Sequence, residues 1–152
     1  KEKTGKNIYE VNPDECCRLL KVEPTSEAVK DLDAWITGLR KTEGQIREDY
    51  QEVEVKGGLV KINPILQFTE LDIWRYIKRE NIPITSLYFA KNGKRYRSIG
   101  CECCCAPVES NADTIKKIVR ELETTNVAER SGRAQDKEDS YTMQKLRSLG
   151  YM

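Results

Sequence analysis

Two stretches hold all six cysteines of this 152-residue chain: ECCRLLKVEP at residues 15–24 and RSIGCECCC at residues 97–105. Cys16 and Cys17 are adjacent, and the other four cysteines lie within five residues. Disulfide frameworks belong to short secreted chains, and the lysine-rich start of this sequence lacks the apolar core of a signal peptide. Adjacent cysteines also make poor disulfide partners, because their side chains cannot reach the required dihedral angle without strain. The cysteine pattern therefore favours a metal site.

The type of metal is left open by the spacing. The chain has no histidine, so a metal site here would consist of thiolates, which suit zinc or an iron–sulfur cluster. Cys101 and Cys104 have the separation of an ordinary chelating pair, whereas adjacent ligands are unusual in a structural zinc site. A cluster spreads its ligands over several irons, so neighbouring thiolates can bind different ones. Reduced, buried cysteines that bind no metal are the simplest alternative.

Composition excludes several classes of function. The 26 basic and 25 acidic residues give a net charge of +1, which does not indicate a general nucleic-acid-binding protein. No apolar run approaches the ~18–20 residues that a transmembrane helix needs. The absence of histidine excludes imidazole general bases and histidine-containing triads. We therefore expect a soluble, cytoplasmic protein with neither a nucleic-acid nor a membrane partner.

The pattern of apolar residues predicts a mostly helical chain with one β-hairpin. Residues 1–15 are polar and are expected to be a linker or lead-in segment. Helices are expected from Ser26 to Gly38, after the capping box at Thr69–Asp72, from about Asn111 to Leu122, and through residues 143–149. Residues 53–62 alternate around Gly57-Gly58, which predicts a hairpin with a tight turn. Trp35 and Trp74 are expected to lie in the core.

The residues around the cysteines resemble the assimilatory adenylylsulfate and phosphoadenylylsulfate reductases of the iron–sulfur type. Besides the two cysteine stretches, LDAWITGLR at residues 32–40 carries the resemblance, which covers roughly residues 9–133. The 83 residues between Cys17 and Cys101 are similar to the Cys-Cys…Cys-x-x-Cys arrangement of that family. The resemblance implies an α/β fold. Residues 16–152 would form the C-terminal part of its adenine-nucleotide α-hydrolase-like (PAPS reductase) domain, mostly helical with a β-hairpin and a cysteine-rich cluster loop.

The resemblance also implies an activity, a cofactor and partners. The activity is the reduction of adenylyl sulfate, or its 3′-phosphorylated form, to sulfite in sulfate assimilation. A thioredoxin-like protein or another thiol is the implied reductant, and we expect a homo-oligomer. The implied cofactor is a [4Fe-4S] cluster, and its ligands would be Cys16, Cys17, Cys101 and Cys104.

Four cations correspond to the substrate-binding residues of the family, namely Lys21, Arg40, Arg130 and Arg133. A phosphate–sulfate anhydride needs fixed cationic donors that pair with its oxyanions. A single lysine or arginine in a chain with 26 basic residues is more often solvated surface, so these roles rest on the resemblance alone.

The chain departs from the family pattern in two ways. The glycine- and serine-rich phosphate loop is absent, and we expect it upstream of Lys1. The C-terminal nucleophilic cysteine is also absent, which leaves Cys103 and Cys105 as candidate nucleophiles where the family has proline and threonine. The ending from Gly132 to Met152 resembles instead the small subunit of bacterial sulfate adenylyltransferase. An adenylyltransferase that makes adenylyl sulfate from ATP and sulfate, and a non-catalytic metal-binding module, are therefore the alternative functions.

Overall fold

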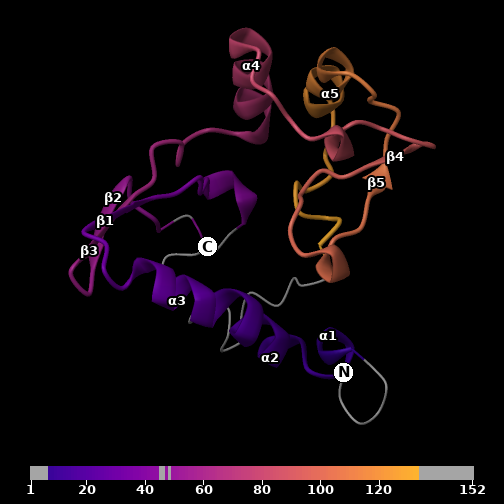
Figure 1. Cartoon of the computed structure of the whole chain (residues 1–152). Helices are drawn as coiled ribbons and strands as arrows, with labels where there is room; N and C mark the ends of the chain where they lie inside the picture. Colours follow the sequence, from indigo (N-terminus) through magenta and orange to yellow (C-terminus); the bar gives the residue numbers. More distant parts are fainter. Residues whose placement is uncertain (1–6, 45–46, 48, 134–152) are drawn as a thin grey trace. The chain divides into compact units, whose positions relative to one another are not determined.

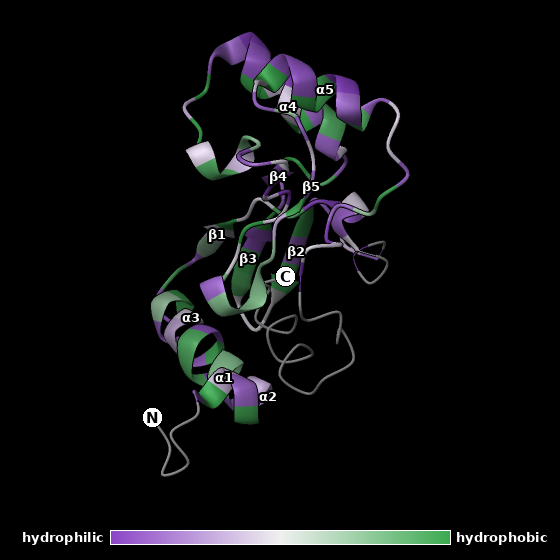
Figure 2. Ribbon diagram, turned by 90° about the vertical axis from the view of Figure 1, so that its right-hand side faces the viewer, coloured by the Kyte–Doolittle hydropathy of each residue, from purple (hydrophilic) through white to green (hydrophobic). Residues whose placement is uncertain are grey.

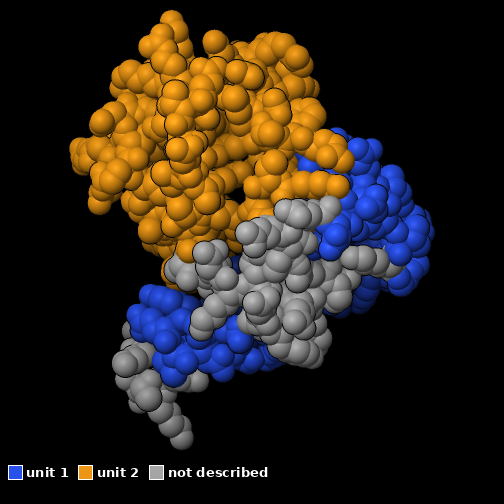
Figure 3. Space-filling view, turned by 180° about the vertical axis from the view of Figure 1, so that it is seen from behind, with its two compact units in different colours: residues 1–39, 49–66, 137–152 blue, residues 40–48, 67–136 orange. Residues whose placement is uncertain are grey.

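The structure, a computed structural model, describes residues 7–44, 47 and 49–133, and its fold is α/β. The chain divides into two compact units, which Figure 3 shows in different colours. Among the described residues, unit 1 contains residues 7–39 and 49–66, and unit 2 contains residues 40–44, 47 and 67–133. No helix in the described part is both long and apolar enough to cross a membrane.

The helices of unit 1 follow one another closely (Figure 1). They are α1 (Ile8–Val11), α2 (Pro13–Cys17), the π-helical turn η1 (Arg18–Val22) and α3 (Glu23–Val29). The Asn12 side chain caps α2 by accepting a hydrogen bond of 3.1 Å from the Glu15 N–H. Pro13 lies at the start of α2, where its missing N–H would have had no partner within the helix. The expected boundary after residue 15 falls inside α2.

The helix expected from Ser26 to Gly38 is wrong in both its bounds. The helical stretch already runs through Ser26, so this residue does not cap its beginning, and α3 ends at Val29. Residues beyond it form a strand, β1 (Ala34–Ile36), which pairs in parallel with β3 (Leu59–Ile62). Aromatic and β-branched side chains such as Trp35 and Ile36 suit a strand once a partner strand is present. Trp35 is half-exposed rather than buried in a core.

The predicted hairpin is confirmed and completes the sheet of unit 1. Strands β2 (Val53–Lys56) and β3 are antiparallel, and the strand order is β1-β3-β2. Gly57 and Gly58 have φ values of 59° and 89°, which only glycine adopts without strain. Leu39, Tyr50 and Leu66 form the buried core of the unit.

Unit 2 packs two amphipathic helices against each other, α4 (Glu70–Glu80) and α5 (Ile115–Leu122), each with a hydrophobic and a hydrophilic side (Figure 2). The capping box is confirmed, because the Thr69 side chain accepts from the Asp72 N–H at 3.1 Å and Asp72 accepts from the Thr69 N–H at 2.9 Å. The core consists of Trp74, Ala112 and Ile118, as expected for Trp74.

The rest of unit 2 is short strands and turns. The strands β4 (Lys94–Arg95) and β5 (Val108–Glu109) are antiparallel, and the 3₁₀ turns are η2 (Lys41–Glu43), η4 (Ser86–Tyr88) and η5 (Glu102–Cys104). The helix α5 begins after Thr114, four residues later than an Asn111 start, because Thr114 caps it. The helix expected through residues 143–149 lies outside the described residues.

Candidate active site: a cysteine loop and an arginine turn

The cysteine loop, residues 100–106 of unit 2, is built around the turn η5. A hydrogen bond of 2.9 Å from the Cys104 N–H to the Cys101 carbonyl closes this turn. Cys104 is buried, whereas Cys101, Cys103 and Cys105 are half-buried. The Sγ atoms of Cys103 and Cys104 are 3.6 Å apart. The loop thus gathers the expected chelating pair and both candidate nucleophiles into one short segment.

The other cysteine pair lies in unit 1, at the end of α2. Cys16 and Cys17 are buried, and the Nζ of Lys21 in η1 is 3.7 Å from the Cys17 Sγ. The predicted substrate cation Lys21 is therefore next to a predicted metal ligand. Since the two pairs belong to different units, the structure gives the geometry of each pair by itself. Within the described residues, no three cysteine or carboxylate side chains come close enough together to hold a metal ion.

The arginine turn, residues 130–133, lies against the cysteine loop within unit 2. The Ala106 N–H donates to the Gly132 carbonyl at 2.7 Å, and Cys105 and Arg133 form an isolated antiparallel bridge. The Cys105 Sγ accepts two hydrogen bonds of 2.9 Å, one from Arg133 Nη1 and one from the Gly100 N–H. Two predicted site residues, 28 positions apart, are thus in direct contact. The arrangement places a positive charge and a backbone donor on one half-buried thiol.

Two glycines make this contact sterically possible. A Cβ at Gly132 would overlap the backbone carbonyl of Ala106. A Cβ at Gly100 would overlap the guanidinium of Arg133. The first clash involves rigid backbone and the second the end of a flexible side chain, so the two positions constrain the site differently.

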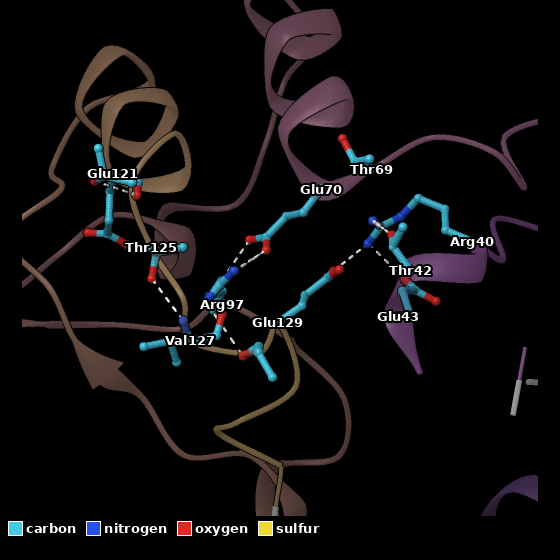
Figure 4. Close-up of polar contacts among 12 residues, drawn as sticks. Arg40, Thr42, Glu43, Thr69, Glu70, Arg97, Glu121, Thr125, Val127 and Glu129 are labelled. Carbon is cyan, nitrogen blue, oxygen red and sulfur yellow. Dashed lines mark hydrogen bonds and ion pairs between the residues drawn. The ribbon is translucent and has the colours of Figure 1, made fainter. Parts of the chain in front are cut away.

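Arg40 is placed in a different environment from the other predicted cations. It is only 6% exposed, and its guanidinium forms ion pairs with Glu43 at 2.9 Å and with Glu129 (Figure 4). A third contact, of 3.5 Å, joins it to the Thr42 hydroxyl. Glu43 also pairs with the buried Arg47, so the two carboxylates neutralise both arginines, and the contact of Arg40 with substrate stays a prediction.

Arg97, whose side chain is only 7% exposed, was not identified from the sequence. Its Nε and Nη2 donate to the Glu70 carboxylate at 2.9 and 2.7 Å, and its Nη1 donates to the Val127 carbonyl at 2.5 Å (Figure 4). The only signal in the sequence was its place in RSIGCECCC, four residues before Cys101. Glu129 directly precedes Arg130, and Glu70 lies within the Thr69–Asp72 capping box, but neither position predicted an arginine partner.

Burial raises the pKa of the Glu70 carboxyl above its ordinary value of 4.5, although the hydrogen bonds from Arg97 oppose this. The negative charge of Glu129 raises the Glu70 pKa further. Burial also raises the pKa of the Tyr88 hydroxyl, with the charge of Glu129 as the next cause. The negative charge of Glu129, just before the arginine turn, therefore affects the pKa values of two partly buried groups in unit 2.

Residues 1–107 match the family model of the phosphoadenosine phosphosulfate reductase domain. The chain belongs to this family. Both cysteine pairs lie within the matched region, whereas Arg130 and Arg133 lie beyond it. The C-terminal resemblance to sulfate adenylyltransferase depends mainly on residues 134–152, which lie outside the described residues.

Several curated relatives of this reductase-domain chain are adenosine 5′-phosphosulfate reductases. The chain is 37% identical to reductase 2 of Bacillus subtilis over 107 residues, which are 69% of this chain and 44% of that protein. It is 39% identical to the Neisseria meningitidis serogroup B protein over 101 residues, 65% of this chain and 39% of that protein. It is also 39% identical to the Mycolicibacterium smegmatis protein over 114 residues, which are 74% of this chain and 47% of that protein. The chain thus spans less than half the length of these relatives.

We predict that Gly132→Ala and Gly100→Ala affect this family member differently. The alanine at position 132 must push backbone apart, so we expect a loss of about 1–3 kcal/mol in the free energy of unfolding. At position 100 the arginine side chain can move away, so we expect a change within about 0.5 kcal/mol. Urea unfolding of the two variants and the parent at one pH measures both values. Equal losses would contradict the close backbone approach at Gly132.

We also predict opposite pH dependences for two carboxyls in the first turn of α4. Because the Glu70 pKa is raised, its protonated form favours folding, and this stability is lost as the pH rises from 4.5 through the raised pKa. Hydrogen bonds from Thr69 lower the Asp72 pKa below 3.8, so its contribution is present above 3.8 and is lost as the pH falls through the lowered pKa. Urea unfolding of Glu70→Gln and Asp72→Asn across this range should show differences from the parent of opposite slope. Slopes of the same sign would contradict the assignment.

Proposed function

We propose that this chain is part of an enzyme that reduces adenylyl sulfate (adenosine 5′-phosphosulfate), or its 3′-phosphorylated form, to sulfite. The main support is the Cys105 Sγ, which accepts hydrogen bonds from the Arg133 guanidinium and the Gly100 N–H. A thiol in such a cationic setting suits nucleophilic attack on an anionic sulfate ester. The family and the names of the curated reductases support the same reaction.

The proposed cofactor is a [4Fe-4S] cluster, and the chemistry of the donor set fits it. Unit 1 offers two cysteines and unit 2 four, and the chain has no histidine that would favour a mixed zinc site. Cys16 and Cys17 would supply two ligands and Cys101 and Cys104 the other two. A cluster ligated in this way has no open coordination position, so when bound it would support the sulfate group electrostatically.

The cations would bind the phosphosulfate. Arg130 and Arg133 come from the turn beside the proposed nucleophile, and Lys21 stands beside Cys17. Guanidinium groups pair with two oxyanion oxygens at once, which fixes the orientation of the sulfate sulfur. Arg40, which forms ion pairs with Glu43 and Glu129, is the fourth proposed substrate contact.

The proposed reaction transfers the sulfonate group to a thiolate. The Cys105 sulfur attacks the sulfate sulfur, the bond to the bridging phosphate oxygen breaks, and the nucleoside monophosphate leaves with that bond's electron pair. A second thiol then attacks the Cys105 sulfur, which releases sulfite and leaves a disulfide. The two electrons therefore come from two thiols. The second thiol would be Cys103, two residues away, or a thioredoxin-like or other external reductant.

For the cofactor, we expect anaerobically purified protein to be brown and to contain iron and acid-labile sulfide in equal amounts. Changing Cys16, Cys17, Cys101 or Cys104 to serine should remove the colour and the iron, since each change deletes one thiolate ligand. Cys103→Ser is the matched control from the same loop and should keep both. A colourless protein with one bound zinc would contradict the cluster.

For the reaction, we expect the protein at its natural full length to release sulfite from adenylyl sulfate with a thiol reductant. Cys105→Ser should abolish sulfite release and keep the iron content, because it removes only the nucleophile. Cys103→Ser should still release sulfite when an external thiol is supplied. Sulfite release by Cys105→Ser would exclude Cys105, and ATP formation from adenylyl sulfate and pyrophosphate without any sulfite would establish the adenylyltransferase instead.

A further inference from the structure

We infer that Arg97 is a positioning residue that holds the arginine turn against the cysteine loop. The inference rests on the proposed function in that Cys105 and Arg133 are the groups whose contact it maintains. Arg97 precedes Cys105 in the same stretch of sequence, residues 97–105, but the family resemblance gave it no role. Its hydrogen bonds join three separate segments of unit 2.

The Arg97 guanidinium donates hydrogen bonds from both of its sides. One side forms a fork with the Glu70 carboxylate at the start of α4: Nε donates to Oε1 at 3.0 Å and Nη2 donates to Oε2 at 2.7 Å. The other side donates to the carbonyls of Val127 and Ala128, at 2.5 and 3.5 Å. The Arg97 and Glu70 side chains are only 7% and 10% exposed, so water competes little for the bonds between them. The segment before the arginine turn is therefore fixed to the first turn of a packed helix.

A second tie acts on the next residue of the same segment. Glu129 is 13% exposed and pairs with Arg40, which also pairs with Glu43 (Figure 4). Arg97 and Arg40 thus hold residues 127–129 from two different elements. Neither arginine contacts Cys105 in the described hydrogen bonds, so both would act on the site through the backbone.

The backbone from residue 128 to 133 can transmit this constraint because it is tightly turned. The Ser131 N–H donates to the Ala128 carbonyl at 3.1 Å, and the Arg133 N–H donates to the Arg130 carbonyl at 2.9 Å. Two successive turns leave little freedom between the anchored segment and Arg133. If residues 127–128 were released, we expect Arg133 to leave the Cys105 sulfur more often.

Arg97→Lys is the informative change, since it keeps the positive charge beside Glu70. A lysine ammonium lacks the planar fork and cannot make the same bonds to Glu70 and to Val127 at once. A loss seen with lysine therefore reports the geometry rather than the charge. Arg75→Lys is the matched control, because Arg75 makes a single exposed ion pair of 2.8 Å with Glu123 in the same unit.

The readout is the charge preference of Cys105 alkylation in the intact chain, with modified sites resolved by tandem mass spectrometry. A guanidinium beside the sulfur favours anionic iodoacetate over neutral iodoacetamide, so the ratio of the two rates reports how often Arg133 is in place. Arg133→Gln gives the ratio expected without that charge. We expect Arg97→Lys to lower the parent ratio by roughly fivefold toward this value, the size of a lost ion-pair contact of about 1 kcal/mol. Arg75→Lys should keep the parent ratio.

The inference would be overturned if Arg97→Lys had the same ratio of iodoacetate to iodoacetamide rates as the parent. It would also be overturned if Arg133→Gln had that same ratio. If Arg97→Lys does not fold, Glu129→Gln releases the second tie and must lower the ratio for the inference to stand. A change that only exposes the thiol would raise the rates with both reagents and leave their ratio unchanged. The ratio is measured without any turnover, so absent sulfite release would refute the proposed reaction and leave this result interpretable.

Discussion

The contact between Arg133 and Cys105 is the interaction on which the rest of the candidate site depends. A neutral sulfur is a weak acceptor, and a guanidinium is normally better solvated by water. The contact therefore requires a backbone that brings the two groups together, and the bond from Ala106 to the Gly132 carbonyl does this. Glycine at positions 100 and 132 leaves the space that the approach needs. The geometry of the thiol is thus a result of how two loops pack, more than of attraction between two side chains.

Unit 2 uses its arginines in two distinct ways. The side chains of Arg40, Arg95 and Arg97 are at most 7% exposed, and each has a carboxylate partner; for Arg95 this is Glu121, at 2.7 Å. Burying such pairs costs nearly as much desolvation as the attraction returns, so their main effect is to specify which segments meet. Arg130 and Arg133 are half-buried in a turn beside a thiol. The buried set holds backbone in place, and the second set faces the proposed chemistry.

Local signals in the sequence were sufficient where the structure is itself local. Gly57-Gly58 and the Thr69–Asp72 capping box predicted the hairpin and the start of α4, because both depend on bonds between near neighbours. Trp35 and Ile36 were misassigned, because their strand exists only through pairing with residues 61 and 62. Arg97 was missed for the same reason: its partners are 27 and 30 positions away. The sequence alone does not distinguish a paired, shielded arginine or lysine from a solvated one, because the distant partners are not apparent in it.

The position of Cys105 explains how a nucleophile could arise in this loop. The family resemblance implies a threonine there, and a hydroxyl oxygen can accept hydrogen bonds from the same two donors that the Cys105 sulfur uses. A loop that already directs a backbone N–H and a guanidinium at this point stabilises any acceptor placed there. Replacing the oxygen with sulfur keeps the acceptor and supplies a far better nucleophile at neutral pH. The two donors and the glycines that admit them therefore support the proposed thiol chemistry at this position of the cysteine loop.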